Sequence, residues 1–337
     1  MLIKNRQGWE LPDSAATPEA LFFGRRELLK GAGIAAFAGV LAGCDNSPSA
    51  AAGAPAAPAP ADDPSAALYP FKRNPKYTLD RPLTPANIVS NYNNYYEFGD
   101  GKDDPARLAG KLQIRPWQIS IEGMVEKPFK VDFDTLMKAM PMEERLYRHR
   151  CVETWSFAVP WSGFPLKALV DYAKPMSGAT YVEMKTFQNP AQAPGQRVIF
   201  YPWPYTEGLT IAEATNDMAF MVTGAYGKPL PKQNGAPLRL ATPWKYGFKS
   251  IKGIQRIIFT NQRPKSYWQA LTPSEYGFWA NINPAVPHPR WSQESEWLLD
   301  ANAYLGTGVR VPTKLYNGYA DQVASLYANI KGEQLFR

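Results

Sequence analysis

Thirty-two prolines are distributed along this chain of 337 residues, and they constrain its fold more than any other feature. Proline lacks the backbone N–H that a helix interior or a central strand needs, which argues against a helical bundle. We therefore expect short strands and short helices joined by many loops. A hydrophobic content of 45% supplies a large core.

The pattern of apolar residues indicates a mixed architecture. Trp117, Ile119 and Ile121 alternate with polar residues, which is the period of a half-buried strand. Asp132 or Asp134 can cap a short helix that ends at Ala139. We expect strands at residues 117–122, 129–133, 146–151, 181–187, 218–222, 236–240 and 254–260, and further helices at 165–173, 211–214 and 321–330. Strands and helices do not alternate regularly, so the predicted fold class is α+β, with long irregular loops.

Residues 1–44 have the organisation of a twin-arginine export signal. The segment Gly24-Arg25-Arg26-Glu27-Leu28-Leu29-Lys30 precedes an apolar run that is much shorter than the roughly 20 residues of a membrane-spanning helix. The alternative is the basic start of a helix in a cytosolic protein. The twin-arginine route carries folded proteins, commonly with an inserted cofactor, so we expect a periplasmic protein that binds a cofactor.

The segment Leu41-Ala42-Gly43-Cys44 resembles a lipobox, in which the cysteine is acylated and becomes the mature N-terminus. The Ala/Pro-rich residues 45–67 suit a flexible tether between a lipid and a domain that spans residues 68–337. The alternative is an ordinary cleavage site with Cys44 discarded.

The formal charge of +7 is modest, and the basic residues are spread along the chain. A nucleic-acid-binding protein would have a basic stripe or a recognisable motif, and neither is present. An anionic cofactor is a simpler partner for a few of these charges.

Cys151 is the one cysteine outside the predicted signal, so it has no partner for a disulfide within the domain. We expect it on a strand face with Tyr147 and His149, and we expect Arg148 and Arg150 to favour its thiolate if they approach the sulfur. The simplest interpretation is a small buried hydrophobic residue. Cys–His catalysis would have to use His149 or His288, but no known nucleophile motif is present.

Metal chemistry leaves one further possibility for the Cys151 thiol. A zinc site needs about four Cys, His or carboxylate ligands in close spacing, and haem attachment needs a Cys-x-x-Cys-His motif. The sequence has neither pattern. A metal that brings most of its own ligands needs only one thiolate from the protein. The molybdenum-pterin cofactor, with its dithiolene sulfurs, fits that description.

Five segments resemble those of the sulfite-oxidase-like molybdopterin enzymes, and in particular those of the members of this family that reduce methionine sulfoxide. They are Asn91-Tyr92-Asn93-Asn94-Tyr95-Tyr96-Glu97-Phe98-Gly99, Arg150-Cys151-Val152-Glu153, Gln233-Asn234-Gly235-Ala236-Pro237, Pro243-Trp244-Lys245-Tyr246-Gly247-Phe248-Lys249 and His288-Pro289-Arg290-Trp291-Ser292-Gln293. The resemblance implies a mixed-sheet molybdopterin-binding domain that holds one molybdenum.

The resemblance also implies the residues of the site. Cys151 is expected to be the catalytic residue and the protein ligand to molybdenum. Asparagine, glutamate and threonine side chains match the hydrogen-bonding edges of a pterin, and arginine and lysine match its phosphate. The residues implied in cofactor binding are Asn93, Tyr96, Glu97, Thr186, Asn234, Arg239, Ser250, Ile251 and Lys252. Each could instead be structural, since Asn-Gly is a common turn pair.

Further residues are candidates for the substrate side of the site. An aromatic rim that receives a thioether could come from Trp155, Trp161, Tyr246, Phe248, Tyr276 and Trp279, although core packing is the alternative for each. His288, Arg290 and Glu275 are candidates for moving protons or orienting the substrate.

The expected activity is reduction of methionine sulfoxide in envelope proteins by oxygen-atom transfer. Few residues follow Thr260, so we expect a monomeric catalytic subunit without an internal haem relay, fed with electrons by a membrane-embedded haem subunit. The alternatives are oxidation of sulfite or reduction of small S- or N-oxides at the same centre. A non-enzymatic alternative is an exported lipoprotein that binds a solute.

Overall fold

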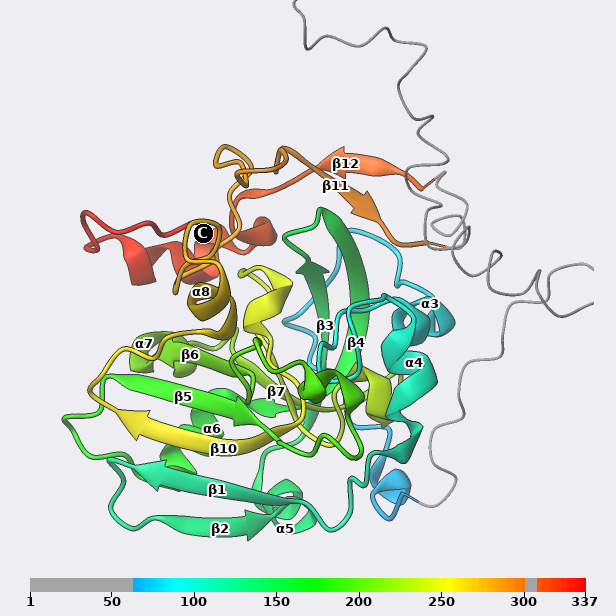
Figure 1. Ribbon diagram of the computed structural model, residues 1–337, viewed down its shortest axis with the longest axis vertical. Helices are drawn as coiled ribbons and strands as arrows, with labels where there is room; N and C mark the ends of the chain where they lie inside the picture. The colour runs from blue at the N-terminus through cyan, green and yellow to red at the C-terminus, as the bar shows by residue number, and fades with distance from the viewer. Residues whose placement is uncertain (1–62, 301–307) are drawn as a thin grey trace, which may run out of the picture. The chain divides into compact units, whose positions relative to one another are not determined.

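The computed structural model describes residues 63–300 and 308–337 (Figure 1). The predicted export signal, Cys44 and the tether up to residue 62 lie outside the described residues. Asp63 and Ser65 are buried, and Asp63 Oδ1 lies 3.2 Å from the Arg115 guanidinium. The packed structure therefore already includes residues that composition assigned to the tether.

One sheet has five strands in the order β2-β1-β10-β5-β6. Strands β1 and β10 are parallel, and the other neighbours are antiparallel. Ile119 and Ile121 of β1 are fully buried, which confirms the predicted alternation. The bounds are β1 Gln118–Gly123, β2 Phe129–Asp132, β5 Tyr181–Thr186, β6 Thr206–Thr210 and β10 Ile254–Thr260.

The second sheet has seven strands, with β4 at its centre. Strand β4 pairs antiparallel with β3 and β7 and parallel with β11. The bounds are β3 Glu143–Arg150, β4 Trp155–Pro165, β7 Phe220–Ala225, β8 Lys228–Pro229, β9 Arg239–Ala241, β11 Ser295–Leu298 and β12 Arg310–Pro312. The sequence did not predict β4, because nearly all of its residues are buried and two prolines interrupt any alternation.

The helices are short, as the prolines predict. Asp132 caps α5 by accepting a hydrogen bond from the Asp134 backbone N–H, and Thr210 and Glu213 form a capping box on α7. The α-helices are α3 Ala86–Asn91, α4 Asp104–Leu108, α5 Phe133–Ala139, α6 Leu166–Ala173, α7 Ile211–Ala214, α8 Tyr267–Leu271 and α9 Ala320–Val323. The 3₁₀ helices are η2 Ala66–Leu68, η3 Ala109–Lys111, η4 Pro194–Arg197, η5 Lys232–Asn234, η6 Gly247–Lys249, η8 Leu315–Gly318 and η9 Ala324–Tyr327.

These elements confirm an α+β fold with mixed sheets. The helix predicted for residues 321–330 is instead the pair α9 and η9. In Figure 1, β3 and β4 stand beside the five-stranded sheet, and α8 lies above it. Within residues 63–300 and 308–337, no helix has the length and apolar character needed to span a bilayer.

Candidate functional site

Cys151 lies at the first position of the tight turn that joins β3 to β4. Its backbone N–H donates to the Trp155 carbonyl at 2.8 Å, and the Thr154 N–H donates to the Cys151 carbonyl at 3.0 Å. Thr154 has a φ of 74°, which is strained for a β-branched residue. Strand β3 ends at Arg150, so Cys151 lies just beyond the strand on which it was predicted. The paired strands hold the turn, and the turn fixes the position of the thiol.

A cavity of about 930 Å³, including its open mouth, adjoins this turn. Its walls come from the chain after α3, the β3–β4 turn, β9, the segment after η6, and α8. Cys151 and eight of the nine residues implied in cofactor binding line it, namely Asn93, Tyr96, Glu97, Asn234, Arg239, Ser250, Ile251 and Lys252. The fold thus gathers residues spread over a hundred and more sequence positions into one site.

Thr186 is the implied cofactor residue that does not line the cavity. It is buried at the end of β5, and its hydroxyl donates to the Gly253 carbonyl at 3.2 Å. Thr186 also hydrogen-bonds to Glu97 and lowers the pKa of that carboxyl, though less than burial raises it. Its position is therefore behind the wall, where it supports Glu97.

Asn93 provides a direct test of whether the cavity fits a polar heterocycle. Its side chain is buried and lines the cavity, and neither its Nδ2 nor its Oδ1 has a hydrogen-bond partner. A buried amide without partners costs free energy, so such groups are normally satisfied. An amide offers one donor and one acceptor in the same plane, and a pterin edge presents the complementary set.

Two buried cations make the same cavity suited to an anion. Arg239 donates to the backbone carbonyls of Asn234 and Ser250, at 3.0 and 3.4 Å, and has no salt bridge among the described residues. Lys252 Nζ donates to the Asn94 carbonyl at 2.8 Å. Burial lowers the pKa of Arg239 to about 10, and it also lowers the pKa of Lys252 and raises that of Glu97. A phosphate would relieve the cost of burying these cations.

The electrostatics at Cys151 differ from the prediction. Burial, followed by the Glu153 carboxylate, raises the pKa of the thiol to about 12. We expected Arg148 and Arg150 to favour the thiolate if they approach the sulfur, and Arg150 does lower the pKa of the thiol, although burial outweighs it. Arg148 turns away to pair with Asp80 and Glu296. A metal bound at the sulfur would have to displace the proton.

A polar cluster surrounds the thiol, and sequence reasoning did not assign it. Glu153 Oε2 accepts from Lys102 Nζ at 2.5 Å, from Trp155 Nε1 at 2.9 Å and from Asn94 Nδ2 at 3.0 Å. The Asn94 amide also lies 3.7 Å from Cys151 Sγ. Asn94 and Glu153 belong to two of the quoted motifs, so that signal was available. Lys102 could be recognised only from the tertiary structure.

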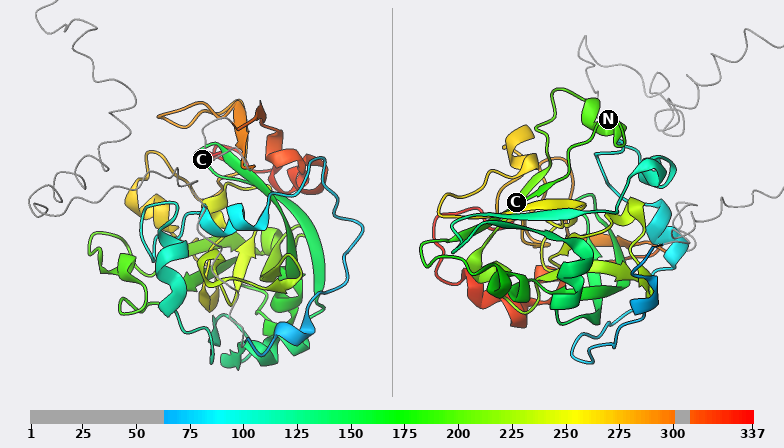
Figure 2. Two further views of the ribbon diagram at one scale, coloured as in Figure 1. Left: turned by 90° about the vertical axis from the view of Figure 1, so that its right-hand side faces the viewer. Right: turned by 90° about the horizontal axis from the view of Figure 1, so that it is seen from below.

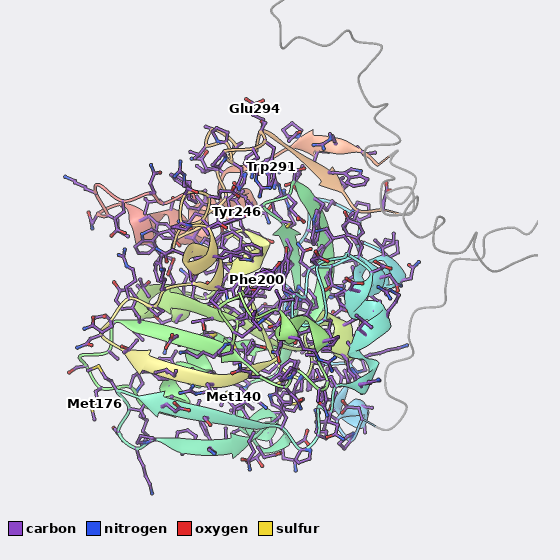
Figure 3. The ribbon with its side chains drawn as sticks, in the orientation of Figure 1. Met140, Met176, Phe200, Tyr246, Trp291 and Glu294 are labelled. Carbon is purple, nitrogen blue, oxygen red and sulfur yellow. The ribbon has the colours of Figure 1, made fainter. Side chains whose placement is uncertain are left out.

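Four of the six predicted rim aromatics line the cavity, namely Trp155, Trp161, Phe248 and Tyr276. Trp161 is fully buried and is part of the core. Tyr246, labelled in Figure 3, belongs with Cys151 to a small buried apolar cluster but does not itself line the cavity. Trp279 is directed elsewhere, since its indole N–H donates to Glu333. The prediction missed Trp268, which lines the cavity from α8.

Neither histidine is poised to activate the thiol. His149 lines the cavity, but its Nε2 accepts a hydrogen bond from Trp161 Nε1 at 2.6 Å, and burial holds its pKa well below 6.5. His288 stacks on Trp291 and lies 3.4 Å from Glu275. Glu275 also pairs with Arg290, so the three predicted proton or orientation groups do come together. They adjoin the cavity through the ring of Tyr276, 5.5 Å from that of His288.

The arrangement fits a metal that brings its own ligands. In the part of the chain that the structure describes, no three His, Cys, Asp or Glu side chains are arranged to hold a metal ion. The one thiol among the described residues, that of Cys151, faces a cavity that offers unpaired pterin-matching groups and buried cations. These donors fit molybdopterin better than they fit a free metal ion.

Comparison with known proteins agrees with this chemistry. The profile of the oxidoreductase molybdopterin binding domain matches residues 107–268. The chain is 43% identical over 329 residues to the protein-methionine-sulfoxide reductase catalytic subunit MsrP of Burkholderia mallei, covering 98% of this chain and 96% of that one. It is 45% identical over 331 residues to the protein of the same description from Xanthomonas axonopodis pv. citri, covering 98% and 99%. The sulfane dehydrogenase SoxCD of Paracoccus pantotrophus aligns with a TM-score of 0.42 and 16% identity, over 67% of this chain and 59% of that one.

Proposed function

The chain belongs to the MsrP family of protein-methionine-sulfoxide reductase catalytic subunits, and from that premise we infer that it is a molybdopterin-dependent reductase of methionine sulfoxide residues. The observation that carries this inference is the convergence of Cys151, Asn93 and Arg239 on one cavity. A thiol, an unpaired amide and an unpaired buried cation are the groups that the cofactor's metal, pterin and phosphate need.

We propose roles for the cavity residues on this basis. Cys151 would be the protein ligand to the metal. Asn93 and Glu97 would hydrogen-bond the pterin, with Thr186 supporting Glu97 from behind. Arg239 and Lys252 would hold the phosphate, together with the backbone and side chain of Ser250. The other proposed wall positions are Tyr96, Asn234 and Ile251.

The bound cofactor would supply two-electron oxygen-atom transfer, so that a sulfoxide, two electrons and two protons give a thioether and water. The protein's own residues would position the reactants. Asn94 and Trp155 fix the Glu153 carboxylate beside the thiol, so one oriented acceptor stands at the reacting centre. The rings of Trp155, Phe248 and Tyr276 form an apolar wall that excludes water and suits a thioether, because sulfur packs favourably against aromatic rings.

The cellular setting is also a proposal. We propose that the twin-arginine signal exports the folded protein to the periplasm, and that Cys44, if acylated, anchors it to the membrane. A membrane-embedded haem subunit would supply the electrons. The description of both relatives as catalytic subunits supports a separate electron-donor subunit. Mass analysis of the mature N-terminus tests the fate of Cys44, since an acylated cysteine and a cleaved signal differ in mass.

Metal analysis and one substitution test the enzymatic proposal. Purified protein should contain about one molybdenum and one pterin per chain, and with a chemical reductant it should reduce methionine sulfoxide. Cys151→Ser should abolish that turnover and change the metal's spectrum while leaving the thermal unfolding of the apoprotein nearly unchanged. Full activity of Cys151→Ser, protein without molybdenum, or turnover of sulfite in place of the sulfoxide would each contradict the proposal.

A further inference from the structure

Two large apolar side chains are exposed at the tip of the loop between β5 and β6. Ile199 is 93% exposed and Phe200 is 75% exposed, whereas no other large hydrophobic residue among those described exceeds 55%. Single exposed apolar residues are ordinary, but adjacent ones at such exposure commonly mark an interaction site. Figure 2 shows this loop, in green, projecting beside the gold helix α8.

The loop that carries the pair is anchored to the wall of the cavity. The Gly195 N–H donates to the Glu97 carbonyl at 2.8 Å, and a Cβ on Gly195 would lie 2.0 Å from the Tyr96 carbonyl oxygen. Only glycine permits so close an approach. The Gln196 side chain bridges the Asn189 N–H and the Phe187 carbonyl. These contacts fix the N-terminal side of the loop against residues of the cavity wall.

An unbroken series of aromatic rings joins the tip to the cavity. Ring centroids are 5.5 Å apart for Phe200 and Tyr201, 6.1 Å for Tyr201 and Tyr267, and 5.5 Å for Tyr267 and Trp268. Trp268 lines the cavity and packs at 5.0 Å against Tyr96, which lines it too. Packed aromatic rings thus connect the exposed pair to the cavity wall, through Tyr267, which is itself buried.

We propose that Ile199 and Phe200 bind the apolar side chains that flank the oxidised methionine in a protein substrate. This inference rests on the proposed function, because it needs a methionine sulfoxide in the cavity. A methionine side chain that reaches Cys151 brings its own main chain across the mouth, and the residues flanking it then lie over the adjoining surface. Ile199 and Phe200, on a loop anchored to the cavity wall, would favour apolar flanks over polar ones, because contact with apolar flanks removes apolar surface from water.

Peptide kinetics with a chemical reductant test this docking role without any electron-donor subunit. The substrates are free methionine sulfoxide, a peptide with its sulfoxide flanked by leucines, and the same peptide flanked by serines. The wild-type enzyme should prefer the leucine peptide by about 10- to 100-fold in kcat/KM. The double variant Ile199→Ser/Phe200→Ser should lose that preference, mainly through KM, and should turn over free methionine sulfoxide within about twofold of wild type.

Met176→Ser is the matched control, because Met176 is also apolar and 51% exposed but lies far from Phe200 (Figure 3). It should leave all three activities unchanged. An unaltered preference in the double variant, or an equal loss on all three substrates, would overturn the docking role alone. In a parallel assay in which membranes supply the electrons, a loss of activity of the double variant seen only there would also overturn the docking role, since the pair would then contact the donor subunit. A wild-type holoenzyme inactive on all three substrates would overturn the proposed function, and the docking role with it.

Discussion

Replacing Arg239 by methionine should weaken cofactor binding while lowering the stability of the apoprotein by no more than about 3 kcal/mol. In the apoprotein, burial lowers the pKa of Arg239 from 12.5 to about 10, so the buried charge destabilises the fold by about 3 kcal/mol. Methionine removes that cost. It also removes the hydrogen bonds to the Asn234, Leu240 and Ser250 carbonyls, two of them 3.4 Å long, and the contact with the Trp161 ring at 5.1 Å.

The two effects partly cancel. The 3.0 Å hydrogen bond from the charged guanidinium contributes about 1.5–3 kcal/mol, each of the two 3.4 Å bonds about 0.5 kcal/mol, and a buried cation–π contact about 2 kcal/mol. The apoprotein should therefore lose no more than about 3 kcal/mol. In the holoprotein, a charge-assisted contact to the phosphate is lost, at about 1.5–3 kcal/mol, so the cofactor should bind roughly 10- to 150-fold more weakly.

Two measurements on the same variant test this reasoning about Arg239. Urea unfolding of the cofactor-free protein gives the apoprotein stability, and molybdenum and pterin content after dialysis gives cofactor retention. Arg239→Lys is the matched control, since it keeps the charge and should retain more cofactor than Arg239→Met. If Arg239→Met keeps a full complement of cofactor, or if its apoprotein loses well over about 3 kcal/mol, then Arg239 has a structural role and the anion site lies elsewhere.

Two further predictions concern ion pairs of very different burial. Lys102→Met removes the cation that lies 2.5 Å from the Glu153 carboxylate in a half-exposed setting, so the unfolding free energy should change by less than about 1 kcal/mol. The kcat for free methionine sulfoxide should fall. An unchanged kcat would exclude a role in turnover for the Lys102–Glu153 pair. Glu213→Gln breaks a buried pair with Lys245, also 2.5 Å apart, and should cost about 3–5 kcal/mol at pH 7 by urea unfolding. Burial alone would raise the pKa of Glu213, but Lys245 outweighs it and the pKa lies below 4.5. A carboxyl group whose pKa is lowered in the folded state stabilises the fold above about pH 4.5, and this contribution is lost as the pH falls further. The difference in unfolding free energy between wild type and Glu213→Gln should therefore shrink on acidification. A difference that stays constant with pH would contradict the assignment.

The sequence predicted the local elements well where one residue pattern decided them. The alternation at Ile119 and Ile121 predicted β1, and Asp132, one of the two predicted caps, begins helix α5. It failed at β4, the central strand of the larger sheet, because a strand buried on both faces has no alternation to read. The C-terminal helix was predicted as one element and is two short ones.

For the site, the sequence by itself determined the chemistry that is available. One thiol without a partner limits the metals that it can bind, and the quoted motifs indicated which polar side chains to expect around it. The tertiary structure alone decided which of those groups face one another. It placed Lys102 against Glu153, moved Arg148 away from Cys151, and put Thr186 behind the cavity wall. Contacts between residues tens of positions apart depend on how β3, β4 and the loops pack, and no local pattern encodes that packing.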